Sequence, residues 1–218
     1  MSEQSVRLAF AHTELMSRGF FSNSDLNQIS TGQSQLPLLT WPFLDFLQSI
    51  ERSFERLIEL GSGNSTKWLA KIFKEVQSFE TNPEWCEQVR KEVPDNCTIN
   101  LVTEDQIIDL DITYNESDSV LVDFAGKRSM YIKKLLDRKG VLPNTIFLDN
   151  ADWYRNGAEL LHKAGYAEIP FFGFKSGQTW LSCTSLFTRD VKNLMSKNKM
   201  MKVPSTARGG NNQWDVIE

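Results

Sequence analysis

The sequence predicts an α/β protein with a doubly wound, mostly parallel sheet, and two patterns carry that prediction. From residue 56 onward, short apolar runs alternate with amphipathic segments, as strands and helices do in such folds. The alternation ends in two consecutive strand-like segments, 167–174 and 180–187, separated by the loop 175–178. A loop of this length and composition is typical of a β-hairpin, so the sheet must contain an antiparallel strand.

The first fifty residues differ in texture and are expected to form an N-terminal arm and a lead-in helix. Residues 2–35 are polar, with one short apolar group at 19–21. Apolar residues in 43–50 then recur at helical spacing, with Thr40 as the expected cap and Pro42 in the first turn.

The α/β part is expected at 51–190, and a flexible polar tail at 191–218. Before the hairpin, strands are expected at residues 56–60, 76–80, 98–103, 119–124 and 145–148. The intervening helices are expected at residues 65–76, 83–92, 129–139 and 154–163. The run 119–124 is apolar almost throughout, as in a strand buried on both faces.

Composition excludes several classes of protein. The 218 residues are 40 % hydrophobic, and 24 Lys and Arg against 28 Asp and Glu give a net charge of −4. This balance favours neither nucleic acid nor a membrane surface as a partner. We expect neither a signal peptide nor a membrane-spanning run, and the three cysteines are odd in number and lack paired spacing. We therefore expect a reduced, cytoplasmic protein.

The sharpest local pattern is a strand, a glycine turn and a helix start over residues 57–66. Gly61 and Gly63 allow a tight turn and close approach of a ligand to the backbone, and Ser65 or Thr66 can cap the following helix. Such a turn is equally compatible with a purely structural role.

Glu80 makes a nucleotide site the favoured interpretation. It ends the next apolar run, about 20 residues further along, where α/β nucleotide-binding proteins place the acid that accepts ribose hydroxyls. A dinucleotide site would need a third glycine where Thr66 stands, and a P-loop motif is absent. Glu59, just before the turn, suits a positively charged ligand such as the ammonium of S-adenosylmethionine (SAM).

The segment Glu59-Leu60-Gly61-Ser62-Gly63 resembles motif I of the class I SAM-dependent methyltransferases, and Glu80 matches their acid after the second strand. The resemblance covers residues 56–189. It implies a Rossmann-like sheet of seven strands with an antiparallel C-terminal strand, and makes 51–190 the SAM-binding domain. It implies a cofactor site formed by Glu59, Gly61, Ser62, Gly63, Glu80, Glu104 and Asp123. Glu104 would contact the adenine, although a plain solvated turn is an equal alternative there.

Two strand ends carry a second group of polar residues. Asp123 ends the fourth strand, and Asp149 and Asn150 end the fifth, so all three should meet at the carboxyl edge of the sheet. Two carboxylates and an amide oxygen suit Mg²⁺. The alternative is that Asp149 and Asn150 cap the next helix and that Asp123 has a backbone or cofactor-proximal role.

These three residues also resemble the metal ligands of the cation-dependent catechol and caffeoyl-CoA type O-methyltransferases. The match is incomplete, because Lys127 is displaced by about one position from the family's lysine and Asp152 adds a third acid. The resemblance implies a metal held by Asp123, Asp149 and Asn150 at the substrate's oxygens.

Aromatic residues gather at the same edge and could form the wall of a pocket for an apolar or planar substrate, or belong to the core. They are Trp153, Tyr154, Phe171, Phe172, Phe174 and Trp180. His162 is expected to end a helix, and His12 lies in the arm.

The resemblance implies methyl transfer from SAM to an oxygen, rather than a nitrogen, of a small molecule, with Asp123 and Asp149 as catalytic residues. Two alternatives stay open: a nicotinamide-dependent oxidoreductase, and a SAM-fold protein that binds without turnover. The absence of an Asn/Asp-Pro-Pro-Tyr/Phe motif disfavours a nucleic-acid methyltransferase. A homodimer through the arm is a further open alternative.

Overall fold

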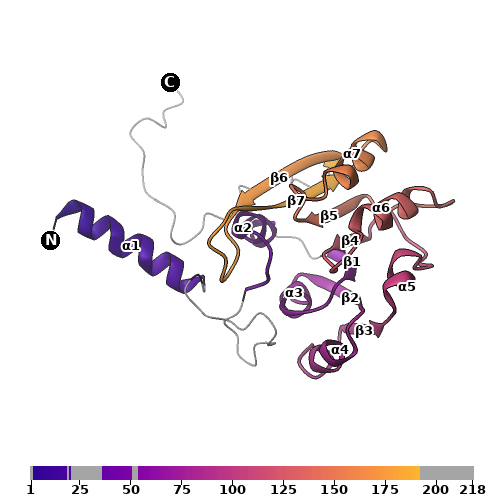
Figure 1. The fold of residues 1–218 in the computed structure, drawn as a ribbon, viewed down its shortest axis with the longest axis horizontal. Helices are drawn as coiled ribbons and strands as arrows, with labels where there is room; N and C mark the ends of the chain where they lie inside the picture. Colours follow the sequence, from indigo (N-terminus) through magenta and orange to yellow (C-terminus); the bar gives the residue numbers. More distant parts are fainter. Residues whose placement is uncertain (1, 19, 21–35, 51–53, 192–218) are drawn as a thin grey trace.

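The computed structural model, which describes residues 2–18, 20, 36–50 and 54–191, contains one sheet of seven strands between two layers of helices (Figure 1). The strands are β1 (Phe54–Leu60), β2 (Phe73–Glu80), β3 (Cys97–Leu101), β4 (Ser119–Val122), β5 (Thr145–Asp149), β6 (Ala167–Gly173) and β7 (Ser182–Thr188). The helices are α1 (Glu3–Ser17), α2 (Trp41–Ser49), α3 (Asn64–Leu69), α4 (Pro83–Arg90), α5 (Glu104–Ile108), α6 (Arg128–Leu136) and α7 (Arg155–Lys163).

The strand order is β3-β2-β1-β4-β5-β7-β6, and it confirms the predicted doubly wound sheet. Strands β1 to β5 are parallel to one another, whereas β7 runs antiparallel to both β5 and β6. The chain reverses direction across the sheet between β1 and β4. In open α/β sheets, a crevice forms at this switch point, outside the carboxyl ends of the strands.

The two faces of the sheet are covered by different helices, because successive residues of a buried strand point to opposite faces. In β1, Leu57 packs with residues of α2 and α3, whereas Ile58 packs with residues of α5, α6 and α7. Helix α4 also covers the face on which α2 lies. It packs on Ile99 of β3, which pairs with Ser78 of β2, and Ser78 points to the same face as Val76, two residues earlier, which packs with α2.

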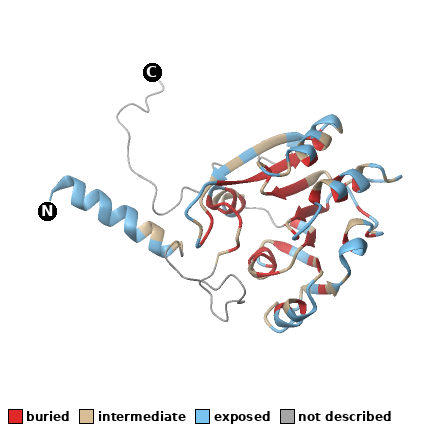
Figure 2. Ribbon diagram, viewed as in Figure 1, coloured by how far each residue is buried: buried red, intermediate tan, exposed pale blue. Residues whose placement is uncertain are grey.

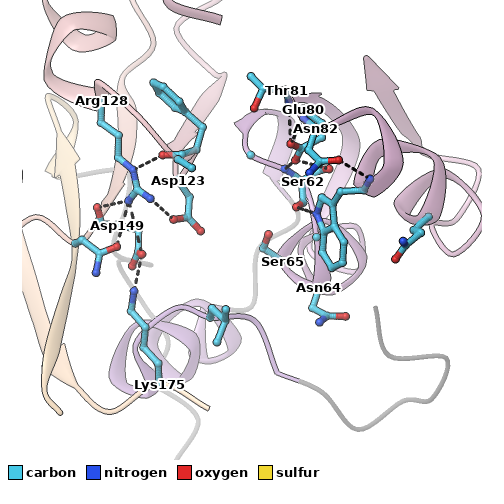
Figure 3. A pocket seen from close by; sticks show the side chains of 18 of the residues that line it. Ser62, Asn64, Ser65, Glu80, Thr81, Asn82, Asp123, Arg128, Asp149 and Lys175 are labelled. Carbon is cyan, nitrogen blue, oxygen red and sulfur yellow. Dashed lines mark hydrogen bonds and ion pairs between the residues drawn. The ribbon is translucent and has the colours of Figure 1, made fainter. Parts of the chain in front are cut away.

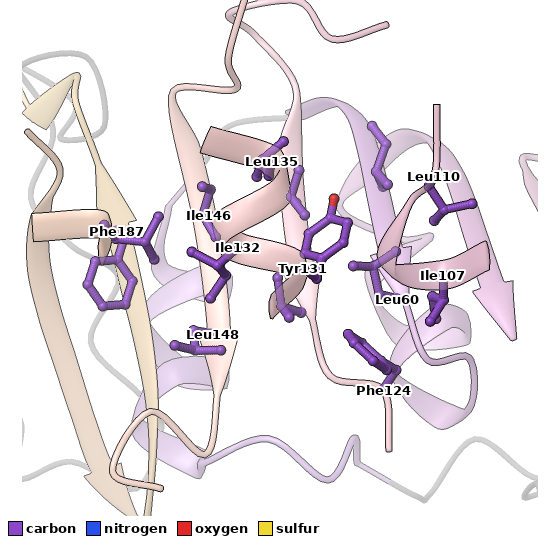
Figure 4. Close-up of a cluster of buried hydrophobic side chains, with 14 of the residues drawn as sticks. Leu60, Ile107, Leu110, Phe124, Tyr131, Ile132, Leu135, Ile146, Leu148 and Phe187 are labelled. Atoms are coloured by element: carbon purple, nitrogen blue, oxygen red, sulfur yellow. The ribbon is translucent and has the colours of Figure 1, made fainter. Parts of the chain in front are cut away.

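The α6 side of the core is centred on Tyr131, which is fully buried (Figure 4). Its hydroxyl shares a hydrogen bond of 2.8 Å with the hydroxyl of Tyr114, so neither buried phenol lacks a partner. Buried residues lie on the strands and on the inward faces of the helices, and exposed residues lie on the outward faces (Figure 2).

The structure differs from the prediction in one expected helix and in one helix that was not expected. The helix predicted at 65–76 was wrong in its second half, because α3 ends at Leu69 and Phe73 begins β2. Phe73 pairs with Phe54, so β2 extends to match the whole length of β1. Helix α5 was not predicted. It is five residues long and begins with reciprocal hydrogen bonds between Thr103 and Gln106.

The N-terminal arm contains a helix, α1, that the sequence did not indicate, and the helix projects from the body of the protein (Figures 1 and 2). None of its residues is buried, and Ser2 caps its first turn. Apart from Val191, the predicted tail lies outside the described residues, as do 21–35 of the arm. Among the described residues, no helix combines the length and apolar character needed to cross a membrane.

The lead-in helix is present as α2, with Thr40 at its N-cap position, and it packs against the β6–β7 hairpin. The backbone N–H of Trp41 donates to the carbonyl of Phe174 at 2.9 Å. Pro42 lies so close to Gly173 that a Cβ added there would be 2.5 Å from the proline Cδ. Gly173 therefore lets α2 approach the hairpin.

We predict that Gly173→Ala lowers the free energy of unfolding by about 1 to 3 kcal/mol, because the new methyl group overlaps the ring of Pro42. Urea titration of wild type, both single variants and the double variant with Pro42→Ala measures the effect. In the Pro42→Ala background the cost should fall below half. An equal cost in both backgrounds would contradict the steric explanation.

Candidate functional site

A cavity of about 980 Å³ opens at the carboxyl edge of the sheet, at the switch point between β1 and β4. The loops after β1, β2, β4 and β5 line it, and the β6–β7 hairpin loop closes one side. This volume suits a nucleoside-sized ligand together with a second small molecule. Most of the residues that the sequence singled out line this cavity.

The turn after β1 requires glycine at its first position. Gly61 has φ +94°, and a Cβ there would lie 2.8 Å from the carbonyl oxygen of Asp123. The loop after β4 therefore passes directly against the glycine turn. Gly61, Ser62 and Gly63 all line the cavity, so a ligand can contact this backbone closely.

Glu80 lies across from the turn and is held by four hydrogen-bond donors (Figure 3). One carboxylate oxygen accepts from the N–H and the hydroxyl of Ser62, both at 3.0 Å. The other accepts from the N–H groups of Thr81 and Asn82, both at 2.8 Å. The carboxylate is thus fixed in the cavity wall before any ligand arrives.

Glu59 does not line the cavity, although the sequence placed it among the ligand-binding residues. Its side chain is fully buried beneath the turn and accepts from the hydroxyls of Ser65 at 2.6 Å and Thr66 at 2.5 Å. Burial raises the pKa of Glu59 to about 7, against the opposing effect of these hydroxyls. Glu59 therefore shapes the turn from behind.

The predicted acidic cluster at the strand ends includes an arginine (Figure 3). Arg128, at the start of α6, is 8 % exposed and pairs with Asp123 at 2.9 Å. Its guanidinium also donates to the carbonyls of Phe124 at 2.8 Å and Asp149 at 2.7 Å, and to Asn150 Oδ1 at 3.3 Å. One guanidinium therefore ties together the ends of β4 and β5.

Asp149 is held by a second cation, which comes from the hairpin. Lys175 Nζ lies 2.5 Å from Asp149 Oδ2, and both side chains are almost completely buried. The hydroxyl of Thr184 donates to Asp149 Oδ1 at 2.7 Å. Both oxygens of Asp149 thus have partners within the protein.

The magnesium site predicted from Asp123, Asp149 and Asn150 is not supported. Each of these side chains directs an oxygen to Arg128 or Lys175, so two cations already balance the two carboxylates. Within the described parts of the chain, no group of three His, Cys, Asp or Glu side chains is placed to hold a metal ion. The helix-cap alternative is wrong too, since the N-cap residue of α7 is Tyr154.

Asp123 has an unusual protonation equilibrium. Burial and the neighbouring charge of Asp149 raise the pKa of Asp123 above its ordinary value, although Arg128 and Lys175 act in the opposite direction. A carboxyl group with a raised pKa in a cavity is a frequent feature of functional sites.

The other singled-out residues divide into two groups. Glu104, Trp153 and Trp180 line the cavity. The remaining aromatic and histidine residues lie elsewhere: Phe171 and Phe174 pack in the α2 side of the core, Tyr154 covers Arg128, Phe172 and His162 line a separate groove, and His12 is exposed on α1.

Arg128 and Lys175 were not among the site residues predicted from the sequence. Arg128 follows Asp123 closely, so its proximity carried a weak signal. Lys175 lies 26 residues beyond Asp149, in a loop that the sequence marked only as a turn. Only the antiparallel pairing of β5 with β7 brings that loop to the site.

Solved structures share this fold. The chain is similar to the precorrin-6y C5,15-methyltransferase from Geobacter metallireducens, with a TM-score of 0.53 and 15 % identity over 75 % of this chain and 95 % of that chain. It is also similar to TrmK from M. capricolum, solved in complex with S-adenosylhomocysteine, with a TM-score of 0.51 and 10 % identity over 71 % and 70 % of the two chains. The chain has the class I methyltransferase fold.

At this level of identity, the likeness extends to the fold alone. No protein-family model matches the sequence, and no curated protein matches it. Any function of the cavity at the switch point therefore follows from the residues that line it.

We predict that Glu59→Gln changes how stability depends on pH. Since the folded-state pKa of Glu59 is about 7 against an ordinary 4.5, ionising it destabilises wild type as pH rises from about 4.5 through 7. The variant has no carboxyl group to ionise at this position. The difference between its free energy of unfolding and that of wild type should therefore grow in favour of the variant by up to about 3 kcal/mol across that pH range.

Urea titrations from pH 4.5 to 8 measure that difference. Glu87→Gln, on an exposed position of α4, is the matched control and should differ from wild type by a nearly constant amount. A pH-independent difference for Glu59→Gln would show that Glu59 is ionised throughout.

Proposed function

We propose that the protein binds SAM and transfers its methyl group to an oxygen, rather than a nitrogen, of a small molecule. The observation that carries the proposal is the convergence of three features in one cavity: the glycine turn after β1, the fixed carboxylate of Glu80, and the charged cluster after β4 and β5. The fold is consistent with it.

The residues present fit SAM in size and chemistry. Gly61 and Gly63 would let the methionine portion approach the backbone, and Glu80 would accept hydrogen bonds from the ribose hydroxyls. The Ser62 hydroxyl, which now donates to Glu80, can rotate to release that position. Glu104 lines the cavity near the end of β3 and is available to the adenine amino group.

Bound SAM would supply an electrophilic methyl group on a sulfonium. The chain's own contribution is position: Arg128 fixes the loops after β4 and β5, so that Asp123 and Asp149 face the cavity at set distances from the turn. Holding an acceptor in line with the methyl carbon accounts for most of the acceleration expected of such a site.

The charges around the cavity favour a small acceptor over a nucleic acid. Five carboxylates line it against two cations, Arg128 and Lys175. The carboxylates are those of Glu80, Glu84, Glu104, Asp123 and Asp149. A polyphosphate backbone would be repelled at this rim, because like charges at short range cost binding energy.

Calorimetric titration with SAM and S-adenosylhomocysteine tests the proposal. We expect micromolar binding to wild type. Glu80→Ala and the volume-preserving Glu80→Gln should weaken binding about ten- to a hundredfold, because each removes charge-assisted hydrogen bonds to the ribose.

The matched control is Glu87→Ala, an exposed glutamate outside the cavity wall, which should bind as wild type does. The same titration with NADH separates the oxidoreductase alternative. Tight NADH binding without SAM binding would replace the proposed function, and binding of neither would refute it.

A further inference from the structure

Lys175 is a buried lysine at the wall of the candidate site. Its side chain is 3 % exposed, yet it lines the cavity and extends from the hairpin toward Asp149 (Figure 3). Burying an ammonium group costs free energy, so a lysine in this place needs a partner of opposite charge. Asp149 provides the partner.

The ammonium of Lys175 has hydrogen-bonding capacity beyond that partner. It carries three N–H donors, and Asp149 Oδ2 accepts one. Among the described residues, no second acceptor for Lys175 Nζ is present. Since the residue lines the cavity, an oxygen of a bound molecule can take a further donor.

The loop that carries Lys175 is fixed on both sides. The carbonyl of Phe174 accepts from the N–H of Trp41 at 2.9 Å, and the hydroxyl of Ser176 donates to the carbonyl of Arg18 at 2.9 Å. Arg18 is itself paired with Asp45 of α2 at 3.0 Å. Lys175 is therefore positioned in advance by the N-terminal segments.

Charge at this end of the cavity favours an anion. Asp123, Asp149, Arg128 and Lys175 sum to zero when all are ionised, and to +1 when Asp123 is protonated, which its raised pKa favours. If the proposed function holds, the sulfonium of SAM adds another positive charge. A single oxyanion complements this excess and is small enough to lie away from Glu80, Glu84 and Glu104.

Two indole rings offer flat apolar surface beside the charged cluster. Trp153 is 71 % exposed and Trp180 is 54 % exposed, and both line the cavity. They come from the turn after β5 and from the hairpin, the elements that also supply Asp149 and Lys175. Exposed aromatic side chains at a cavity mouth are suited to stacking on a planar ligand.

We propose that Lys175 binds the reacting oxygen of the methyl acceptor, and that the acceptor is a planar molecule with an acidic hydroxyl that binds as its oxyanion. The inference rests on the proposed function. The hydroxyl proton leaves to water on binding. The oxyanion's electron pair then forms the bond to the methyl carbon, while the electrons of the C–S bond stay on sulfur. Lys175 keeps its proton throughout and replaces a metal ion as the counter-charge.

The test uses 4-nitrophenol, whose oxyanion absorbs visible light and whose neutral form does not. The protein is first saturated with sinefungin, a SAM analogue with an amine at the transfer position and no group to donate. At a pH where both forms of the probe are present, wild type should increase the oxyanion band in a saturable manner.

Three variants assign that band to Lys175. Lys175→Met should weaken oxyanion binding about ten- to a hundredfold, because it removes a charge-assisted hydrogen bond. Lys175→Arg should retain most of it. Lys71→Met, the same change at an exposed lysine outside the cavity wall, should match wild type. Sinefungin affinity, measured for each, shows whether the cofactor side is intact.

The outcomes separate the two proposals. Sinefungin binding without an increased oxyanion band, or probe binding in the neutral form, overturns the role of Lys175 and leaves the proposed function standing. Equal oxyanion binding by wild type and Lys175→Met does the same. If sinefungin, SAM and S-adenosylhomocysteine all fail to bind wild type, both proposals fall. Where Lys175→Met does not fold, the wild-type spectrum still decides whether the probe binds as its oxyanion, and binding of the neutral form still overturns the proposal.

Discussion

The neutralisation of buried carboxylates at the strand ends is the constraint on which the site depends. Asp123 and Asp149 follow adjacent parallel strands, so the topology forces them together. Two neighbouring carboxylates, one of them buried and the other largely shielded from solvent, would be strongly unfavourable as anions without counter-charges. Arg128 supplies one from α6 and Lys175 the other from the hairpin, and each also fixes the element that carries it.

This arrangement links parts of the chain that are remote in sequence. The hairpin loop reaches Asp149 only because β7 inserts antiparallel beside β5. The loop keeps its place because α2 contacts it, and α2 approaches only because position 173 lacks a Cβ. The N-terminal segments are therefore part of the site's construction, although none of the charged groups in their described residues lines the cavity.

Local patterns predicted the glycine-turn side of the cavity well, because its geometry is set within a few residues. The turn at Gly61, the helix behind it and the position of Glu80 all follow from short-range steric rules and strand ends. Boundaries were less accurate. Apolar residues in 69–76 fit a helix by spacing, and only pairing with β1 places Phe73 in a strand. Helix α1 has no buried residue, so the sequence showed no apolar stripe at helical spacing that would have predicted it.

The charged cluster after β4 and β5 could not be predicted in this way, because its chemistry depends on which cations meet the acids. Asp123, Asp149 and Asn150 form a plausible magnesium set when only their own residue types are considered. With Arg128 and Lys175 in place, the same oxygens are already directed at positive charge, and a divalent ion would have to displace a buried guanidinium or ammonium. An ammonium differs from a metal ion in one respect that matters for catalysis: it offers directed N–H donors and a single charge, so it can stabilise one oxyanion but cannot chelate two neighbouring oxygens. The replacement of a metal by Lys175 would therefore favour acceptors that present one acidic hydroxyl over those that present a vicinal pair.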